Sequence, residues 1–340
     1  MQLPAIATTT VGSFPRPAWL AERVRTNTGS HVNFRFDGIV LQAALDDATE
    51  LVLKRQEEIG LDLLSDGEQR RLHFISHILA ACDGIDTINL GAKDNYRRIA
   101  QTRMVPRVVG RVSRRAPAVL EDLRFAKAHT SRPIKMTVPG PLTVVDSTLD
   151  QFYGDEEALA LDIAAALNQE LLDLQNAGCD ALQIDEPAMT RYHEKVIAYA
   201  ARALDRCLEG IHVPTFVHLC YGYPGGGGQH QYEYPALLHE LMKTRIGGFA
   251  VEFARSNYDP KVLEICRGRL VMFGCIDPGD SPVPPLDGIV KRVEQALNYI
   301  APDKLLLAPD CGLMTISPEL AAAKARALVD AARELRRRLS

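Results

Sequence analysis

The sequence has a single tryptophan among its 340 residues and lacks any long hydrophobic run. No apolar stretch approaches the roughly 20 residues that cross a bilayer. The first ten residues have neither the basic segment nor the apolar core of a secretory signal. The chain also lacks a basic surplus, since its net charge is -4, and this argues against nucleic-acid binding. We therefore expect a cytoplasmic protein with neither a membrane partner nor a nucleic-acid partner.

The distribution of cysteines does not indicate a disulfide framework. The seven cysteines are odd in number and scattered, and nothing in the sequence indicates export. Paired cysteines are typical of small secreted domains, so this distribution predicts thiols. The remaining uses of a cysteine are as a buried apolar side chain or as a metal ligand.

The chain alternates short β-branched apolar runs with longer helical patterns, which is typical of a parallel α/β fold. Eight such runs predict a (β/α)8 TIM barrel formed by one domain over residues 1–340. A doubly wound open sheet is the alternative. The expected strands are Ile6–Val11, Leu61–Ser65, Ile134–Val138, Ala181–Ile184, Thr215–Cys220, Phe249–Phe253, Leu270–Gly274 and Lys304–Leu307.

Two segments interrupt this alternation. Residues 89–115 are strongly basic, and we expect them to form an inserted loop or hairpin. Their charge indicates either a site for an anionic donor or acidic partner, or a solvated hairpin face. Residues 221–234 contain four consecutive glycines, Gly225–Gly228. Such a run has no single preferred conformation, so this loop is either a lid over the site or a mobile surface loop.

Metal-ligating side chains occur at the ends of three expected strands. Alternation along a strand places His218 and Cys220 on one face and the aliphatic Val217 and Leu219 on the other. The polar pair would then point into the barrel mouth. A His and a Cys are both zinc ligands, although zinc usually takes three or four protein groups. From the pair alone, a buried thiol beside a hydrogen-bonded histidine remains an alternative.

Two further residues complete a candidate ligand set. Glu252 alternates with large apolar neighbours and so faces inward, where a carboxylate needs a metal or an ion pair with an interior Arg or Lys. Cys311 follows the last expected strand. The candidate zinc ligands are therefore His218, Cys220, Glu252 and Cys311. We expect the other five cysteines to be core thiols: Cys82, Cys179, Cys207, Cys266 and Cys275.

Zinc with two thiolate ligands suits attack by a bound thiol on an electrophilic carbon. A thiol with a pKa near 8.5 is mostly protonated at pH 7, and binding to a Lewis-acidic metal deprotonates it. Glu252 could leave the metal when a substrate sulfur binds. Zinc-assisted hydrolysis is the competing chemistry, but it generally uses His and carboxylate ligands rather than two thiolates.

These motifs resemble the catalytic C-terminal half of cobalamin-independent methionine synthase, and more closely its short single-barrel relatives. The matching stretches are Thr8–Pro15, Asp66–Glu68, Gly140–Thr143, Gln183–Ala188, His218–Tyr221, Val251–Ser256 and Pro309–Leu313. The resemblance implies zinc binding by the four residues above. It also implies that Ser13, Glu68 and Asp185 hold the amino-acid part of homocysteine, with Asp185 counted among the catalytic residues. Carboxylates suit an ammonium group, although structural ion pairing of Glu68 and Asp185 is the alternative.

The sequence departs from the family at two places that concern the methyl donor. The family places a folate-stacking tryptophan after Gly140-Pro141, where this chain has Val144-Val145-Asp146. It also places a catalytic histidine two residues beyond the position of Asp277, where this chain has Pro278-Gly279-Asp280. Asp277 matches the family's aspartate and Asp280 could at most stand in for the missing histidine, so both are candidate catalytic residues. The donor is methyl-tetrahydrofolate, a methylcorrinoid, another methylated compound, or a methyl group delivered by a partner protein.

The leading hypothesis is a zinc-dependent S-methyltransferase that converts homocysteine into methionine. One alternative is alkyl transfer to another thiol, as in the epoxyalkane:coenzyme M transferases of this family. In that reading Arg16, which is also a candidate substrate-binding residue, or the basic segment would bind a sulfonate. The other alternative is a non-catalytic barrel that binds a methyl carrier. The sequence leaves the oligomeric state open, a homo-oligomer included.

Overall fold

A parallel sheet of seven strands forms the centre of the structure. The computed structural model describes residues 3–26, 29–94, 102–221, 234–256 and 258–339. Neighbouring strands of this sheet are parallel throughout. In spatial order they are β1 (Ala7–Thr8), β12 (Leu305–Pro309), β11 (Leu270–Ile276), β10 (Gly248–Glu252), β9 (Thr215–Leu219), β8 (Ala181–Asp185) and β6 (Lys135–Pro139).

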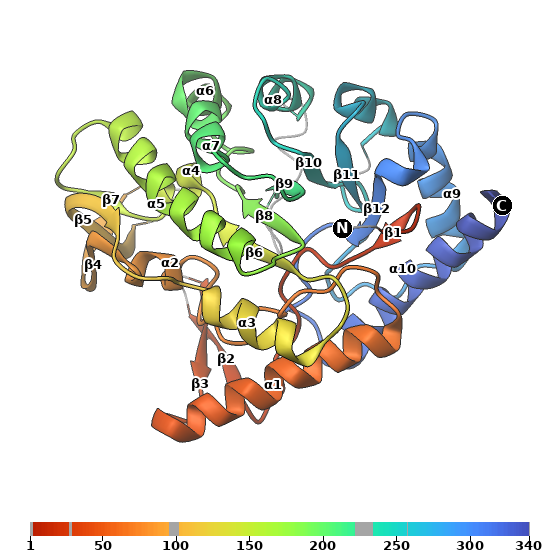
Figure 1. The fold of residues 1–340 in the computed structure, drawn as a ribbon, viewed down its shortest axis with the longest axis horizontal. Coiled ribbons are helices and arrows are strands. Elements are labelled where there is room, and N and C mark those ends of the chain that lie inside the picture. The colour runs from red at the N-terminus through yellow and green to blue at the C-terminus, as the bar shows by residue number, and fades with distance from the viewer. Residues whose placement is uncertain (1–2, 27–28, 95–101, 222–233, 257, 340) are drawn as a thin grey trace.

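An eighth extended segment joins the two edges of this sheet. Thr9 forms a parallel bridge with Leu63, and Leu64 forms another with Ile134, so residues 63–64 lie between β1 and β6. Helices surround the strands in Figure 1. The order of eight extended segments, each followed by helical structure, confirms the predicted (β/α)8 barrel.

The helices are α1 (Gly38–Ile59), α2 (Ser76–Ala80), α3 (Leu120–His129), α4 (Pro141–Asp146), α5 (Glu156–Asn176), α6 (His193–Lys195), α7 (Ala201–Cys207), α8 (Tyr234–Leu241), α9 (Leu286–Leu297) and α10 (Pro318–Leu339). Short 3-10 turns cover Pro260–Cys266 and Pro302–Lys304, and a π-turn covers Val196–Ala200. The π-turn lies directly between α6 and α7 along the chain.

Local sequence explains where the longest helices begin and end. Asp155 accepts hydrogen bonds from the backbone N–H groups of Glu157 and Ala158, which caps the start of α5. α1 ends at Gly60, whose φ of 94° is in the left-handed region that glycine adopts without strain. None of the described helices is long and apolar enough to cross a membrane.

Apolar side chains form two main cores, one on each side of the barrel wall. The larger core lies between the strands and the helices and includes Val217, Leu219 and Val251. A smaller core fills the inside of the barrel, with Phe216, Ala250 and other side chains of the opposite parity. The alternation that the sequence predicts for β9 and β10 is therefore present. Polar side chains occupy the inward positions nearer the carboxyl ends of the strands.

Two hairpins extend the barrel. The predicted insert at 89–115 belongs to the antiparallel pair β4 (Cys82–Lys93) and β5 (Arg103–Arg114), to which β7 (Leu149–Asp150) adds in parallel. A second hairpin, β2 (Ala21–Thr26) with β3 (Gly29–Phe34), lies beside α1 in Figure 1 and was not predicted. The glycine-rich loop predicted at 221–234 falls almost entirely outside the described residues.

Candidate active site

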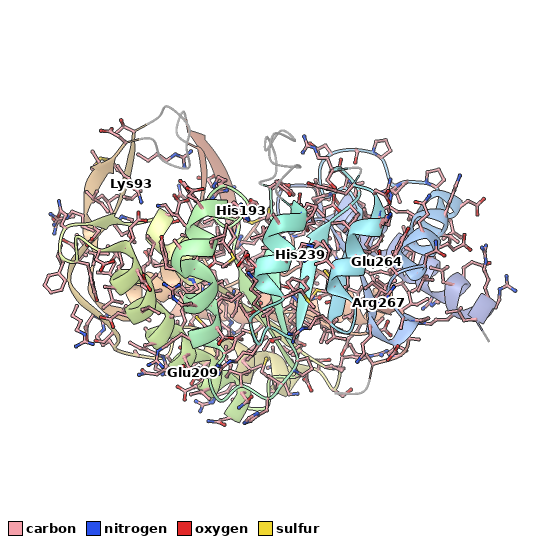
Figure 2. All side chains as sticks on the ribbon, turned by 90° about the horizontal axis from the view of Figure 1, so that it is seen from above. Lys93, His193, Glu209, His239, Glu264 and Arg267 are labelled. Carbon is pink, nitrogen blue, oxygen red and sulfur yellow. The ribbon has the colours of Figure 1, made fainter. Side chains whose placement is uncertain are left out.

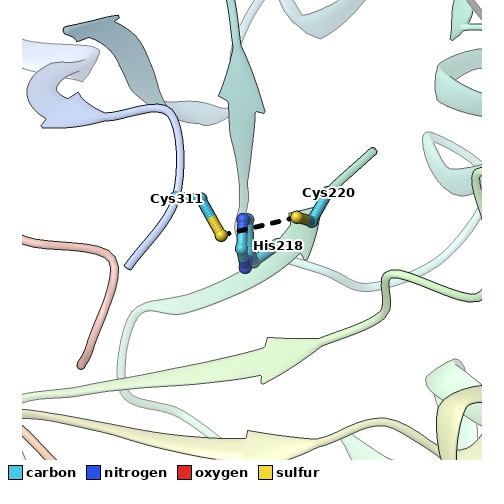
Figure 3. Close-up of side chains that lie close together, drawn as sticks. All are labelled: His218, Cys220 and Cys311. Atoms are coloured by element: carbon cyan, nitrogen blue, oxygen red, sulfur yellow. Dashed lines mark hydrogen bonds between the residues drawn. The ribbon is translucent and has the colours of Figure 1, made fainter. Parts of the chain in front are cut away.

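Three of the four predicted metal ligands lie together at the barrel mouth. The side-chain ligand atoms of His218, Cys220 and Cys311 are all within 4.8 Å of one another. Figure 3 shows the two sulfur atoms pointing toward each other, with Sγ to Sγ at 3.4 Å. All seven cysteines are thiols in the structure. We call His218, Cys220 and Cys311 the sulfur cluster.

Glu252, the fourth predicted ligand, ends β10 beside this cluster. Its side chain is buried, and its Oε1 accepts a hydrogen bond of 3.1 Å from the backbone N–H of Tyr221. Burial raises the pKa of Glu252 well above its usual value, and the nearby Cys220 adds to the effect. Among the described residues, no lysine or arginine forms an ion pair with Glu252. The structure therefore lacks, in its described part, the interior ion pair that was the alternative to a metal.

His218 has the hydrogen bonding of a metal-binding histidine. Its Nδ1 lies 3.2 Å from Oδ1 of Asp185, while its buried Nε2 has no hydrogen-bond partner among the described residues. Metal-ligating histidines typically use one ring nitrogen for a carboxylate and the other for the metal. Burial lowers the pKa of His218, but Asp185 and the Cys220 sulfur outweigh this and raise it to about 10. The surroundings therefore favour a positive charge, and the residues present fit a metal cation.

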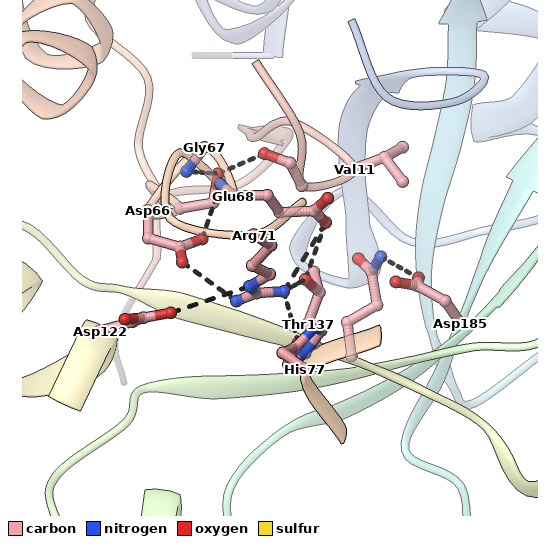
Figure 4. A network of polar contacts seen from close by, with 12 residues as sticks. Val11, Asp66, Gly67, Glu68, Arg71, His77, Asp122, Thr137 and Asp185 are labelled. Atoms are coloured by element: carbon pink, nitrogen blue, oxygen red, sulfur yellow. Dashed lines mark hydrogen bonds and ion pairs between the residues drawn. The ribbon is translucent and has the colours of Figure 1, made fainter. Parts of the chain in front are cut away.

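A second group of charged side chains lies next to the sulfur cluster. Asp66, Glu68 and Asp185, which we call the carboxylate cluster, are all buried. Arg71 is also buried and lies between the first two (Figure 4), with Nη2 at 3.0 Å from Oδ2 of Asp66 and Nη1 at 3.9 Å from Oε1 of Glu68. Thr137 donates a hydrogen bond of 3.0 Å to Oε1 of Glu68. Burial raises the pKa of Glu68, while Arg71 partly offsets the shift.

Two glycines leave room for two of the predicted substrate residues, Glu68 and Ser13. A Cβ atom on Gly12 would lie 2.8 Å from Oε1 of Glu68, and one on Gly312 would lie 2.1 Å from Oγ of Ser13. Ser13 is buried, and its carbonyl accepts a hydrogen bond from Leu313 in the loop that carries Cys311. Ser13 is thus joined to the sulfur cluster through this loop, just as Asp185 is joined to it through His218.

The other predicted site residues have different surroundings. The Arg16 guanidinium donates to the backbone carbonyls of Glu68, Gln69 and Arg71, so it holds the loop that positions Glu68. The carboxylate of Asp277 accepts from Gly279 N at 2.8 Å, and Asp280 is exposed. The contacts of the described residues do not bring either aspartate to the sulfur cluster. Their catalytic roles and the substrate role of Arg16 stay predictions.

Most of the described lysine and arginine side chains of the basic hairpin form ion pairs. Arg107 pairs with Asp86, Arg111 with Asp162, and Arg114 with Glu170 and Asp173. Lys93, at the hairpin end of the molecule in Figure 2, donates to the backbone carbonyls of Val145, Asp146 and Thr148. These contacts favour a structural role for the hairpin over a site for an anionic donor.

Sequence reasoning missed several residues that position the site. Asp310 accepts hydrogen bonds of 2.8–3.0 Å from the backbone N–H groups of Phe253, Ala254 and Arg255, which fixes the loop after Glu252. Arg71 and Thr137 hold Glu68. The only signal for Thr137 was its inward parity on the third expected strand, and Arg71 lies in a loop where no periodicity applies.

Comparison with known proteins gives consistent matches. The chain matches the model of the cobalamin-independent synthase catalytic domain over residues 6–334. It is 28% identical to a methionine synthase of Pyrococcus abyssi, over 100% of this chain and 95% of the relative. A methionine synthase of Sulfurisphaera tokodaii is 29% identical, over 99% and 95%. The structure of a B12-independent methionine synthase from Shewanella sp. W3-18-1 in complex with selenomethionine is 32% identical, with a TM-score of 0.92 over 99% of each chain.

These matches confirm the family that the sequence motifs predict. They also confirm the predicted class of activity, a methyltransferase that acts on homocysteine and yields methionine. Because the family model spans nearly the whole barrel and the solved relative has the same fold end to end, the chain belongs to the cobalamin-independent methionine synthase family.

Proposed function

We propose that this chain methylates homocysteine at a zinc ion held by His218, Cys220, Cys311 and Glu252. The observation that carries this proposal is the sulfur cluster, three metal-capable side chains within 4.8 Å of one another. The buried, unpartnered Nε2 of His218 supports it, because leaving a buried polar atom without a partner is costly. When bound, zinc lowers the pKa of a thiol so that the sulfur is a thiolate at neutral pH.

The amino-acid part of the substrate binds, in this proposal, beside the carboxylate cluster. Asp185 and Glu68 accept the ammonium group, and the Ser13 hydroxyl and nearby backbone N–H groups bind the carboxylate. All three side chains are buried, so few water molecules compete for these contacts. The selenomethionine complex of the Shewanella relative supports an amino-acid pocket of this kind.

Alkyl transfer to a sulfonate thiol is less well supported. That alternative needs a cation for the sulfonate, and Arg16 already donates to three backbone carbonyls. In the basic hairpin, Arg107, Arg111 and Arg114 already pair with carboxylates. The non-catalytic alternative does not explain why a complete candidate ligand set adjoins an amino-acid pocket. A cytoplasmic location stays a prediction.

The methyl donor requires a direct test. In place of an exposed aromatic, the stretch after Gly140 forms the short helix α4, in which Val144 and Val145 are buried. Trp19 lines a pocket of about 210 Å³ together with residues of α1 and α10, and the residues of the sulfur cluster are not among those that line it. The donor panel should contain methyl-tetrahydrofolate, free methylcobalamin and a methylated corrinoid protein. Mass spectrometry of the thiol product then reports which compound donates the methyl group.

Cys311→Ala tests the zinc proposal. We expect the variant to lose bound zinc and to form methionine at least about 1,000-fold more slowly, because the ligand set is no longer complete. Cys266→Ala is the matched control, since Cys266 is a buried thiol in the larger core. The proposal fails if the purified wild type binds no zinc and Cys311→Ala alkylates homocysteine normally.

A further inference from the structure

A lysine lies completely buried inside the barrel below the carboxylate cluster. Lys135, on β6, has no exposed surface. Its Nζ donates hydrogen bonds of 2.7 Å to the carbonyl of Val11 and 2.5 Å to Oε1 of Gln183. A buried ammonium is costly unless it is well paired, and Lys127 on α3 shows the ordinary alternative, a half-exposed lysine on Asp180. The position of Lys135 therefore calls for a specific reason.

The bond from Lys135 fixes the orientation of the Gln183 side chain. A lysine only donates hydrogen bonds, so the amide oxygen of Gln183 must face Lys135 and its NH₂ group must face away. That NH₂ group donates a bond of 2.7 Å to Oδ1 of Asp185. The same oxygen lies 3.2 Å from Nδ1 of His218. Three hydrogen bonds thus connect the buried ammonium to a candidate metal ligand.

The two oxygens of the Asp185 carboxylate have different surroundings. Oδ1 is occupied by Gln183 and His218, whereas Oδ2 has no hydrogen bond to the described residues. One oxygen is then held by the protein, and the other is available to a ligand. Asp185 and Glu68 both interact electrostatically with Lys135. The positive charge of the lysine therefore offsets part of the negative charge of the pocket.

Lys135 also holds the strand end that leads to Ser13. Its second acceptor, the carbonyl of Val11, precedes Gly12 and Ser13 in the first strand-end loop. A single ammonium therefore contacts the chain on both sides of the proposed amino-acid pocket. Burial lowers the pKa of Lys135 to about 8, while the neighbouring carboxylates act against this shift, so the group is mostly protonated at neutral pH.

We propose that Lys135 is a positioning residue for the ammonium group of the substrate, acting through Gln183 on Asp185 without touching the substrate itself. This inference rests on the proposed binding of homocysteine beside Asp185. This role differs from a purely structural one. If Lys135 only stabilised the barrel interior, its loss would affect substrates with and without an amino group equally.

The test is Lys135→Met, measured against Lys127→Met as the matched loss of a lysine remote from the pocket. We expect KM for homocysteine to rise about tenfold or more, with kcat changed less than about threefold, since a hydrogen bond to a charged group is lost indirectly. The affinity for 4-mercaptobutanoate, which lacks the amino group, should stay within about twofold. Zinc content should match that of the wild type, and Lys127→Met should behave as the wild type.

Gln183→Met provides the second variant and covers the case in which Lys135→Met does not fold. It should raise KM for homocysteine in the same way, and the double variant should be no worse than the more affected single variant, because both changes break one chain of bonds. Equal losses for both thiols, or independent effects that multiply, would overturn the inference. A wild type that neither binds nor methylates homocysteine would overturn the proposed function as well, which separates the two failures.

Discussion

The sulfur cluster and the carboxylate cluster lie side by side at the barrel mouth but are completed in different ways. The carboxylates have protein cations beside them, because Arg71 contacts Asp66 and Glu68 and Lys135 reaches Asp185 through Gln183. The sulfur cluster has a buried imidazole nitrogen, Nε2 of His218, with no hydrogen-bond partner among the described residues. Cations of the chain itself therefore balance part of the carboxylate cluster, whereas our proposal assigns a zinc ion to the sulfur cluster.

Asp185 belongs to the carboxylate cluster and connects it to the sulfur cluster through His218. It lies in the amino-acid pocket of our proposal and also orients His218. Binding of the substrate amino group and positioning of the metal-bound sulfur would then depend on the same carboxylate. Such an arrangement would hold the thiol in a fixed place relative to the amino-acid end of the substrate, which is how enzymes lower the entropic part of a barrier.

Metal removal should have the largest effect. Treatment with a chelator such as dipicolinate should abolish methionine formation, by at least about 1,000-fold, because thiol activation depends on the metal. One equivalent of zinc per chain should restore it. If the metal-free protein retains full activity, the contrast between the two clusters has no functional meaning.

Asp185→Asn should affect both clusters. An amide in place of the carboxylate weakens the contact to His218 and removes the charge offered to the ammonium group. We expect kcat/KM for homocysteine to fall by about 100-fold or more, together with about 10- to 100-fold weaker zinc binding. Steady-state kinetics and a competition titration with a chromophoric zinc chelator measure the two effects. If the variant binds zinc as tightly as the wild type does, the two clusters act independently, and Asp185 does not connect them.

Arg71→Met should mainly reduce stability. Removing the cation leaves Asp66 and Glu68 as buried carboxylates without their main partner, so the free energy of unfolding should fall by about 3–5 kcal/mol at pH 7. Urea unfolding checks this, with Arg338→Met, a change at an exposed ion pair, as the control. A loss below about 1 kcal/mol would show that Arg71 does not balance these carboxylates.

The same variant has a predicted pH dependence. Burial already raises the pKa of Glu68 in the folded protein, so the folded state binds this proton more tightly than the unfolded state. Stability from this group is therefore greatest at low pH and falls as the pH rises from about 4.5 through the raised pKa. Loss of Arg71 raises that pKa further. The difference in the free energy of unfolding between the wild type and Arg71→Met should be small near pH 4 and grow toward neutral pH.

The smallest effect should come from the basic hairpin. Arg111 is largely exposed and pairs with Asp162, and exposed ion pairs contribute little. Arg111→Ala should change neither the melting temperature measurably nor the KM of the methyl donor. An increase in donor KM would instead support an anionic donor at the hairpin.

Much of the site could be predicted from the sequence because strand alternation is a local property. Parity alone places His218, Cys220 and Glu252 inside the barrel, and the structure has them there. The Lys135–Gln183–Asp185 chain could not be predicted in the same way, because it depends on which strands are neighbours and how far a lysine side chain reaches. Arg71 lies in a loop with no period to follow.

The fold shows the same division between local and non-local information. Apolar runs identified all eight barrel segments, but the β2–β3 hairpin was missed, since Ala21–Thr26 is mostly polar and lacks a clear alternation. The π-turn at Val196–Ala200 was also missed, because a helical period continues through it.

X-ray absorption at the zinc edge of the purified protein shows directly which atoms bind the metal. We expect one zinc per chain with two sulfur ligands and the remaining ligands nitrogen or oxygen, and a single sulfur ligand in Cys311→Ala if any zinc stays bound. A wild-type spectrum without sulfur ligands, or an active protein without zinc, would contradict the zinc proposal.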